Sequence, residues 1–253
     1  MPMSDNDSRA FADAILAARK PGAAPAALPA VVPTTVDEAY RVQDLVAASL
    51  GPITGWKVGA VDEKSEPFCS PVLADGIMAL ERGPFRCRAT TGIEVEIAFR
   101  MARAFPASAK APSEAAVVAA IGSAHVAMEL CVTRLQTGSK SPALVNLADN
   151  GMNFGFVMGP EVAGWRAIDV HRQGARAIVD GKIVVETTGG HSQKDLLKLL
   201  VWQVGHVVTR RGGLAAGAVI ATGSWTGIHW VEVPAKVAGA FPGLGAMELA
   251  LIA

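Results

Sequence analysis

The sequence predicts an α+β domain that is mostly β, with a helical section at its N-terminus. Apolar residues recur at helical spacing in the first 51 residues. From residue 52 onward the pattern changes to short apolar runs separated by glycine and proline, which is typical of strands. We therefore expect a single domain over residues 1–253, with a helical section in 1–51 and a β-rich core in 52–253.

Two helices are predicted in the N-terminal section. The first covers residues 8–19, where apolar side chains recur at helical spacing, and Pro21-Gly22 ends it. The second follows a capping box formed by Thr35 and Glu38 and stops at Gly51-Pro52. The Ala- and Pro-rich stretch between the helices need not be a domain boundary, because such a stretch can cross a surface in extended form.

The β-rich core begins after the second helix. Its predicted strands lie in the runs GWKVGAV, GIEVEIAF, AHVAMELCV, GFVMG, ARAIVDGKIVVE and AVIATGS. Asp180-Gly181 is a two-residue hairpin signal inside the fifth run. One further helix is expected from about residue 193 to 210, ending at Gly212-Gly213.

Charge and composition exclude several classes of partner. Lysine plus arginine and aspartate plus glutamate number 23 each, so no overall field attracts the chain to nucleic acid or to an anionic membrane. A small-molecule partner is the expectation. The chain shows no apolar stretch of signal-peptide length at its start and no run of about 18 unbroken apolar residues, so we expect a soluble cytoplasmic protein.

Two glutamates stand one residue apart in GIEVEIAF. Side chains alternate between the faces of a strand, so Glu94 and Glu96 share one face and their apolar neighbours the other. Glutamates at alternate positions often belong only to the wet face of a sheet. Glu129, in AHVAMELCV, shares its face with the small apolar residues Ala127 and Cys131 and therefore needs a partner for its charge. That partner is a metal ion, a set of donors, or a basic residue such as Arg134.

Further polar residues are candidates for chemistry. Lys57 lies between glycines in GWKVG, where its ammonium is either partly screened and active in proton transfer or exposed on an edge strand. The remaining candidates either shape turns or contact a substrate. They are Asp75, Asn150, Thr222 and Ser224.

Other site types are disfavoured. The three cysteines, Cys69, Cys87 and Cys131, form no CxxC and are interpreted as buried structural thiols. The five histidines show no metal-ligand spacing. The glycine-rich GLGAMEL lacks the context of a nucleotide-binding loop, so nucleotide cofactors are not expected. Three glutamates from two strands would form an oxygen-rich site that suits Mg²⁺ or Mn²⁺ rather than zinc.

Taken in order, these fragments resemble the fumarylacetoacetate hydrolase superfamily, and within it the branch of 2-keto-4-pentenoate hydratases and 4-oxalocrotonate decarboxylases. The similarity runs from about VDEAYRVQDLV to FPGLGAMELAL. It includes GWKVG, EPFCSPVLADGIM, GIEVEIAFRMAR, AMELCVTR, ADNGMNFGFVMG and AGAVIATGSWTG. The resemblance implies a mixed β-sheet roll like the C-terminal domain of that superfamily, together with the helical N-terminal section.

The resemblance also implies roles for individual residues. Glu94, Glu96 and Glu129 would bind one divalent metal ion, Mg²⁺ or Mn²⁺. Lys57 and Asp75 would be the acid/base and substrate-orienting groups. The implied reaction is the addition of water to a 2-hydroxydienoate or 2-oxo-4-pentenoate-type acid, through an enolate held by the metal. A homo-oligomer is expected, and relatives of this branch also form complexes between a hydratase and a decarboxylase.

The sequence departs from the family pattern at two places. Gly151, Met152 and Asn153 replace the residues usual after the Asp-Asn pair, and Val132 and Thr133 stand where an aspartate and a serine are common. These changes leave the choice of substrate open. The alternatives to a hydratase are a 4-oxalocrotonate-type decarboxylase, a hydrolase of acylpyruvates, and a catalytically silent member that binds a 2-oxo acid or partners an active subunit.

Overall fold

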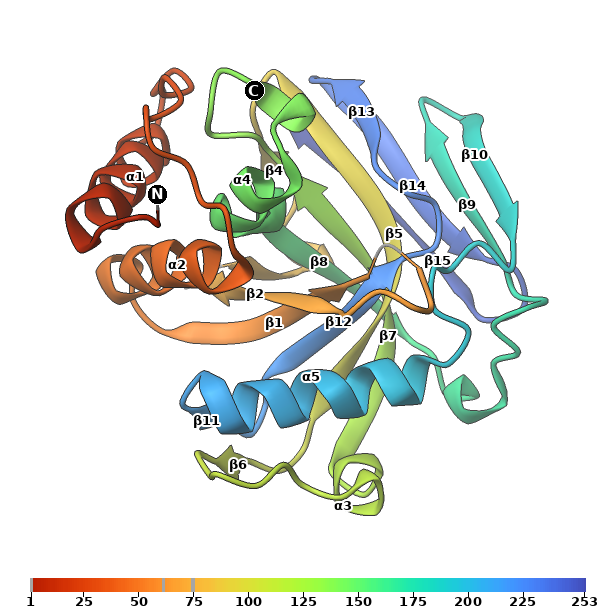
Figure 1. Cartoon of the computed structure of the whole chain (residues 1–253). Helices are drawn as coiled ribbons and strands as arrows, with labels where there is room; N and C mark the ends of the chain where they lie inside the picture. Colours follow the sequence, from red (N-terminus) through yellow and green to blue (C-terminus); the bar gives the residue numbers. More distant parts are fainter. Residues whose placement is uncertain (1, 61, 74–75) are drawn as a thin grey trace.

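The chain folds into two β-sheets that pack against each other, with helices along the larger sheet (Figure 1). This computed structural model describes residues 2–60, 62–73 and 76–253. The predicted α+β class, mostly β, is therefore confirmed. None of the helices in this described part has the length and apolar character needed to cross a bilayer.

The larger sheet is mixed, and within the described residues its strands follow the order β2-β1-β12-β5-β7-β8-β3, with β13 paired to β5. Strands β1 and β12 are parallel, as are β3 and β8, whereas β5 and β7 are antiparallel. Its strands are β1 (Ile53–Gly59), β2 (Phe68–Leu73), β3 (Ile77–Ala79), β5 (Thr90–Met101), β7 (Ile121–Cys131), β8 (Asn153–Glu161), β12 (Val219–Ser224) and β13 (His229–Glu232).

The smaller sheet has the order β10-β9-β14-β15-β4. Its strands are β4 (Phe85–Arg86), β9 (Gly174–Val179), β10 (Lys182–Thr188), β14 (Ala235–Phe241) and β15 (Gly245–Ile252). The short strands β6 (Phe105–Pro106) and β11 (Gly213–Leu214) form a separate pair. The predicted hairpin at Asp180-Gly181 is confirmed, because both residues have positive φ and Lys182 pairs with Val179.

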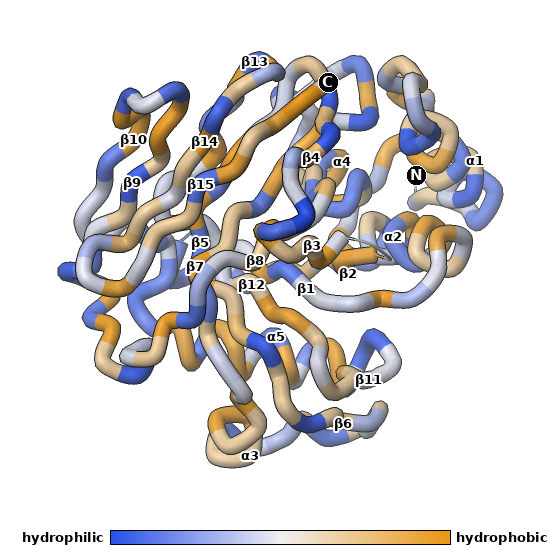
Figure 2. Tube along the Cα trace, turned by 180° about the vertical axis from the view of Figure 1, so that it is seen from behind, coloured by the Kyte–Doolittle hydropathy of each residue, from blue (hydrophilic) through white to orange (hydrophobic). Residues whose placement is uncertain are grey.

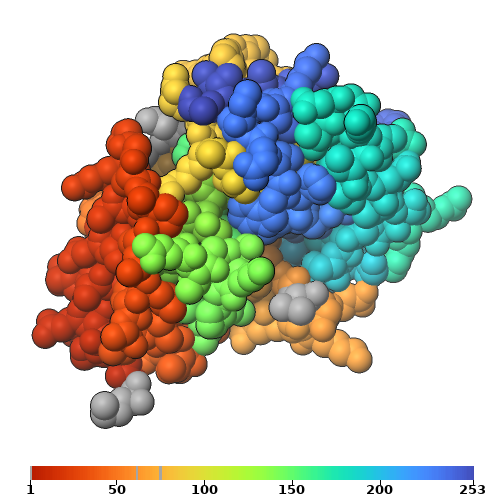
Figure 3. Space-filling view, turned by 90° about the horizontal axis from the view of Figure 1, so that it is seen from above, coloured from red at the N-terminus to blue at the C-terminus, as the bar shows by residue number. Residues whose placement is uncertain are grey.

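Five α-helices complete the described structure: α1 (Asp5–Ala18), α2 (Val36–Leu50), α3 (Glu114–Val118), α4 (Ala143–Ala148) and α5 (Leu196–Arg210). Helix α2 packs against both α1 and α4, and Figure 3 shows the red N-terminal section beside the green segment that contains α4. The N-terminal section therefore lies on the β-rich core and forms one wall of a cavity described below.

Helix capping explains where the sequence-based boundaries were right and wrong. The box of Thr35 and Glu38 is present at the start of α2, as predicted. Helix α1 begins at Asp5 instead of residue 8, because Ser4 and Asp7 form a second capping box. Helix α5 begins at Leu196 instead of 193, because the Asp195 side chain accepts the N–H of Lys198. The predicted runs missed the longer strands β2, β14 and β15 and the short strands β3, β4, β6, β11 and β13.

The two faces of β5 have different functions in the fold. Its apolar side chains, including Ile93, Val95 and Ile97, are fully buried. The smaller sheet covers this face so closely that a β-carbon added to Gly239 of β14 would lie 3.0 Å from Val95. Figure 2 shows both hydrophilic and hydrophobic colour on the hairpin of β9 and β10, where Ile183 and Val184 are exposed. The other face of β5 carries Glu94 and Glu96.

Gly55→Ala should destabilise the protein, because β1 and β12 approach closely there. The added β-carbon would lie 2.6 Å from the backbone oxygen of Val219, which cannot rotate away as a side chain could. We expect a loss of about 1–3 kcal/mol in the free energy of unfolding, measured by urea denaturation. Gly164→Ala is the matched control, since no atom lies within 4 Å of its added carbon. Equal unfolding midpoints for the two variants would contradict this packing.

Candidate active site

The glutamates of the larger sheet converge on one face, as the alternation predicts. Glu94 on β5 lies directly opposite Glu129 on β7, and Glu96 lies opposite Ala127. The three carboxylate residues are 9%, 1% and 0% exposed. They are therefore not the wet face of a sheet, and their charges need partners inside the protein.

Lys57 supplies the first of these partners. Its Nζ lies 2.6 Å from Glu129 Oε1 and 3.0 Å from the carbonyl oxygen of Gly151, to both of which it donates. Asn153 also donates to Glu129 Oε1, at 2.9 Å. Of the sequence-based alternatives, an exposed edge-strand Lys57 is wrong, since its residue is 8% exposed. An ion pair between Glu129 and Arg134 is also wrong.

Arg134 instead holds the loop that completes the site. Its guanidinium pairs with Asp149 at 3.1 Å and donates to the carbonyl oxygen of Asn153 at 2.6 Å, with both charged side chains nearly inaccessible to water. The backbone N–H of Arg134 donates to the same Asp149 carboxylate at 2.9 Å. Because these contacts join the end of β7 to the turn before β8, they place Gly151 and Asn153 beside Lys57 and Glu129.

Small residues stand beside Lys57 on the two neighbouring strands. Two strands, β12 and β5, separate β1 from β7. Lys57 pairs with Ala221 on β12, and Ala221 in turn pairs with Ala98 on β5. Both alanines are fully buried. The same row continues to His125 on β7, so the lysine side chain must lean along the sheet to reach Glu129. Gly151 has a φ of 59°, and a β-carbon there would lie 3.1 Å from Ser70 Oγ, so a side chain at this position would be strained.

Burial and mutual repulsion shift the titration of the site. Burial, followed by the charge of Glu129, raises the pKa of Glu94 to about 7. Burial also raises the pKa of Glu96 well above its ordinary value, with the Glu129 and Glu94 charges adding to the effect. Burial lowers the pKa of Lys57, but the Glu129 charge more than offsets this, so the net shift is upward and Lys57 stays an ammonium ion.

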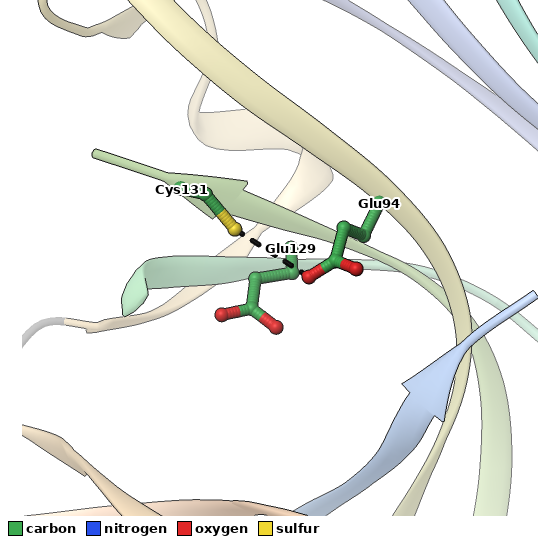
Figure 4. Close-up of side chains that lie close together, drawn as sticks. All are labelled: Glu94, Glu129 and Cys131. Carbon is green, nitrogen blue, oxygen red and sulfur yellow. Dashed lines mark hydrogen bonds between the residues drawn. The ribbon is translucent and has the colours of Figure 1, made fainter. Parts of the chain in front are cut away.

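The site contains a group of side chains with the geometry to hold a metal ion. Ligand atoms of Glu94, Glu129 and Cys131 all lie within 4.8 Å of one another (Figure 4). Glu129 Oε2 is buried and has no hydrogen-bond partner among the described residues. Glu96 lies outside this group, and its Oε2 accepts the backbone N–H of Gly223 at 3.0 Å. The residues present therefore fit a divalent cation.

A cavity of about 840 Å³ reaches this group at Glu94. Lys57, Glu94 and Glu96 line it from the sheet, and Ser224 lines it at the end of β12. Residues of α2, α4 and α5 line it from the helical side, namely Val36, Asp37, Tyr40, Ala143, Leu144, Asn146, Leu147, His206 and Arg210. The space is large enough for a small organic acid beside the carboxylates.

The remaining predicted site residues have mixed positions. Ser224 faces the cavity. Thr222 is fully buried and donates to the carbonyl oxygen of Ile97, so it joins β12 to β5. Asn150 donates through Nδ2 to Pro71, while its buried Oδ1 has no partner within the described chain, and it is not among the cavity-lining residues. Asp75 lies outside the described residues.

Two residues of the site were not assigned to it from the sequence. Cys131 was interpreted as a structural thiol, although its position two residues after Glu129 places it on the same face of β7. Asn153 was noted only as a departure from the family pattern. No local signal in the sequence indicates its contact with Glu129, because the contact depends on the register between β7 and β8.

Metal-stripped protein should lose stability as pH rises from about 4.5 through about 7. The pKa values of Glu94 and Glu96 are raised in the folded state, so folding takes up protons in this window and becomes less favourable as they are lost. Glu96→Gln removes one titrating carboxylate and can still accept the N–H of Gly223. We expect this variant to melt at a higher temperature than wild type at about pH 8 and to show a smaller loss between about pH 5 and about pH 8.

The matched control for this experiment is Glu63→Gln, because Glu63 is exposed. In EDTA, the melting temperature of this control should equal that of wild type at every pH. If the melting temperature of Glu96→Gln also follows that of wild type at every pH, the raised pKa of Glu96 in the folded protein is refuted.

No protein-family model and no curated protein sequence matches the chain. Solved structures do. The 4-oxalocrotonate decarboxylase from Pseudomonas putida G7, complexed with magnesium and adipate, aligns with TM-score 0.80 and 21% identity over 99% of both chains. The same enzyme complexed with calcium and acetate gives TM-score 0.79 and 20% identity, again over 99% of both.

A more distant match shows how far the similarity extends. The 5-carboxymethyl-2-hydroxymuconate delta-isomerase from Mycobacterium smegmatis aligns with TM-score 0.58 and 18% identity, over 79% of this chain and 80% of that one. The isomerase alignment therefore leaves part of the chain uncovered, whereas the decarboxylase alignment covers 99% of it. The chain has the fold of 4-oxalocrotonate decarboxylase over its whole length, which confirms the fold predicted from the sequence.

Proposed function

We propose that the chain is a divalent-metal-dependent enzyme of the fumarylacetoacetate hydrolase superfamily that acts on a small unsaturated 2-oxo acid. One observation carries this proposal. The buried Lys57–Glu129 ion pair stands beside Glu94 and Glu96 at the edge of a cavity of about 840 Å³. Buried charges with shifted pKa values in a cavity are typical of catalytic sites.

The charges of the site support a divalent cation. Three carboxylates and one ammonium ion leave two negative charges when all are ionised, and one divalent ion would neutralise them. Glu94 and Glu129 would hold the ion, with Glu96 as the predicted third ligand. Mg²⁺, or Mn²⁺, is the proposed cofactor, since carboxylate oxygens suit these ions and the matching decarboxylase was solved with magnesium. When bound, it would supply Lewis-acid polarisation of the 2-oxo acid.

Lys57 is the proposed proton donor. An ammonium group has three N–H donors, and the described acceptors, Glu129 Oε1 and the Gly151 carbonyl, use two of them. Because Lys57 lines the cavity, its third N–H can donate to a substrate carbon or oxygen there. Glu129 orients the ammonium group and keeps it charged until the proton moves.

Decarboxylation is the reaction that the comparisons favour, because the structures matched over 99% of both chains belong to a 4-oxalocrotonate decarboxylase. Hydration of a 2-hydroxydienoate, the reaction expected from the sequence resemblance, stays a prediction, as do a homo-oligomer and a complex with a hydratase or decarboxylase partner. Incubating the protein with Mg²⁺ and either 4-oxalocrotonate or 2-hydroxypentadienoate distinguishes the reactions by carbon dioxide release or by a hydrated product. Silence on both substrates despite metal binding would favour a non-enzymatic member of the fold.

Lys57→Met should lower turnover on the order of a hundredfold while the protein still binds Mn²⁺, because a positioned proton donor contributes about that much. Mn²⁺ binding is measured by electron paramagnetic resonance and turnover by substrate absorbance. Lys110→Met is the control, since Lys110 is exposed and should leave both quantities unchanged. Full turnover in Lys57→Met would exclude this residue as the donor.

Arg210→Gln should raise KM for a dicarboxylic 2-oxo acid by roughly tenfold and leave KM for a monocarboxylic one unchanged. Arg210 lines the cavity from α5 and lies 3.9 Å from Asp37, and both side chains are largely exposed, so their mutual attraction is weak. A second carboxylate would gain a charge-assisted hydrogen bond there. Asp37→Asn is the paired variant and should lower the same KM. Equal effects on both substrates would place Arg210 outside substrate recognition.

A further inference from the structure

Cys131 occupies a position from which it can reach a metal ion in the proposed site. Its thiol lies 3.5 Å from Glu94 Oε2, to which it donates (Figure 4). A tetrahedral ion with a sulfur ligand at about 2.3 Å and an oxygen ligand at about 2.1 Å separates these two atoms by about 3.6 Å. The spacing of the sulfur and oxygen atoms therefore already matches two corners of such an ion.

Glu129 provides the next donor of the same group. Its Oε1 is taken by Lys57 and Asn153, whereas its buried Oε2 has no partner among the described residues. An oxygen that is buried without a partner is costly, and a cation beside it removes that cost. Because the two oxygens are divided in this way, Glu129 can keep Lys57 in place and bind an ion at the same time.

Gly92 leaves room for the thiol. It is the residue directly opposite Cys131, and a β-carbon at position 92 would lie 3.1 Å from the β-carbon of Cys131. Ile228 and Trp230 also lie against this position, so a side chain at 92 would displace its neighbours, Cys131 among them. Cys131 and Glu96 consequently stand on opposite sides of the Glu94–Glu129 pair, each as a different kind of third donor.

We propose that Cys131 is a metal ligand, so that the site takes a borderline transition ion such as Zn²⁺ or Co²⁺ through Glu94, Glu129 and the Cys131 sulfur. This inference rests on the proposed metal site. Thiolates bind such ions strongly and bind Mg²⁺ or Mn²⁺ poorly, so the harder ions rely on Glu96 instead. On coordination the sulfur–metal bond forms, the thiol S–H bond breaks, and the proton leaves to solvent.

The test is a titration of metal-stripped protein with Co²⁺, followed by near-ultraviolet absorption. A sulfur-to-cobalt charge-transfer band should develop in wild type and in Cys87→Ser, a control that removes a half-buried thiol elsewhere. The band should be absent in Cys131→Ser and in Cys131→Val, and Co²⁺ affinity should fall by about tenfold or more. Serine is polar and valine is apolar, so if one of these variants does not fold, the other still tests whether the sulfur binds the metal ion. Mn²⁺ binding, measured by electron paramagnetic resonance, should be unchanged in both.

Three outcomes would overturn the inference, and they separate it from the proposed function. If Co²⁺ binds to wild type without the band, the sulfur is not a ligand, and the metal site still stands. If the band persists in the Cys131 variants, another thiol is responsible. If neither Co²⁺ nor Mn²⁺ binds to wild type, the proposed metal site fails and the role of Cys131 fails with it.

Discussion

The ion pair between Lys57 and Glu129 is the interaction on which the site depends. It joins β1 to β7 across two intervening strands, which on a flat sheet would stand about 14 Å apart. The pair closes because the larger sheet curls (Figure 1). Loss of either charge would leave the other buried without compensation, which typically costs several kcal/mol. The Lys57–Glu129 pair therefore depends on the curl of the sheet, and the buried charges of the site depend on that pair.

The surrounding polar contacts fix the same geometry from the loop side. The buried Arg134–Asp149 pair sets the path of the chain between β7 and β8, and through it the positions of Gly151 and Asn153. Both residues then contact the Lys57–Glu129 pair. Gly151 and Asn153 are among the residues that differ from the pattern of the family that the sequence resembles, and in the structure they hold the ion pair. Gly151 and Asn153 therefore stabilise the Lys57–Glu129 pair, independently of any effect on the choice of substrate.

Strand alternation made half of the site predictable. The period of two in GIEVEIAF placed Glu94 and Glu96 on one face, and the need of Glu129 for a partner followed from its apolar neighbours. The partner itself could not be predicted from residue types, since Lys57 and Arg134 are both basic and only the strand order and loop path select Lys57. The strands β14 and β15, near the end of the sequence, could not be predicted from residue types either. They pair with each other and pack on the larger sheet.

The two faces of β5 impose opposite requirements on one strand, and this limits which residues can serve the site. Every second position of β5 must be apolar to meet the smaller sheet, so a third metal donor on β5 comes from the remaining positions, and one on β7 from the residues that face them. Those positions are Gly92, Glu96 and, across the pairing, Cys131. Since Gly92 has no side chain, a cation held by Glu94 and Glu129 has an oxygen donor on one side and a sulfur donor on the other. The register of β5 and β7 thus determines the ligand chemistry that the site can offer to different ions.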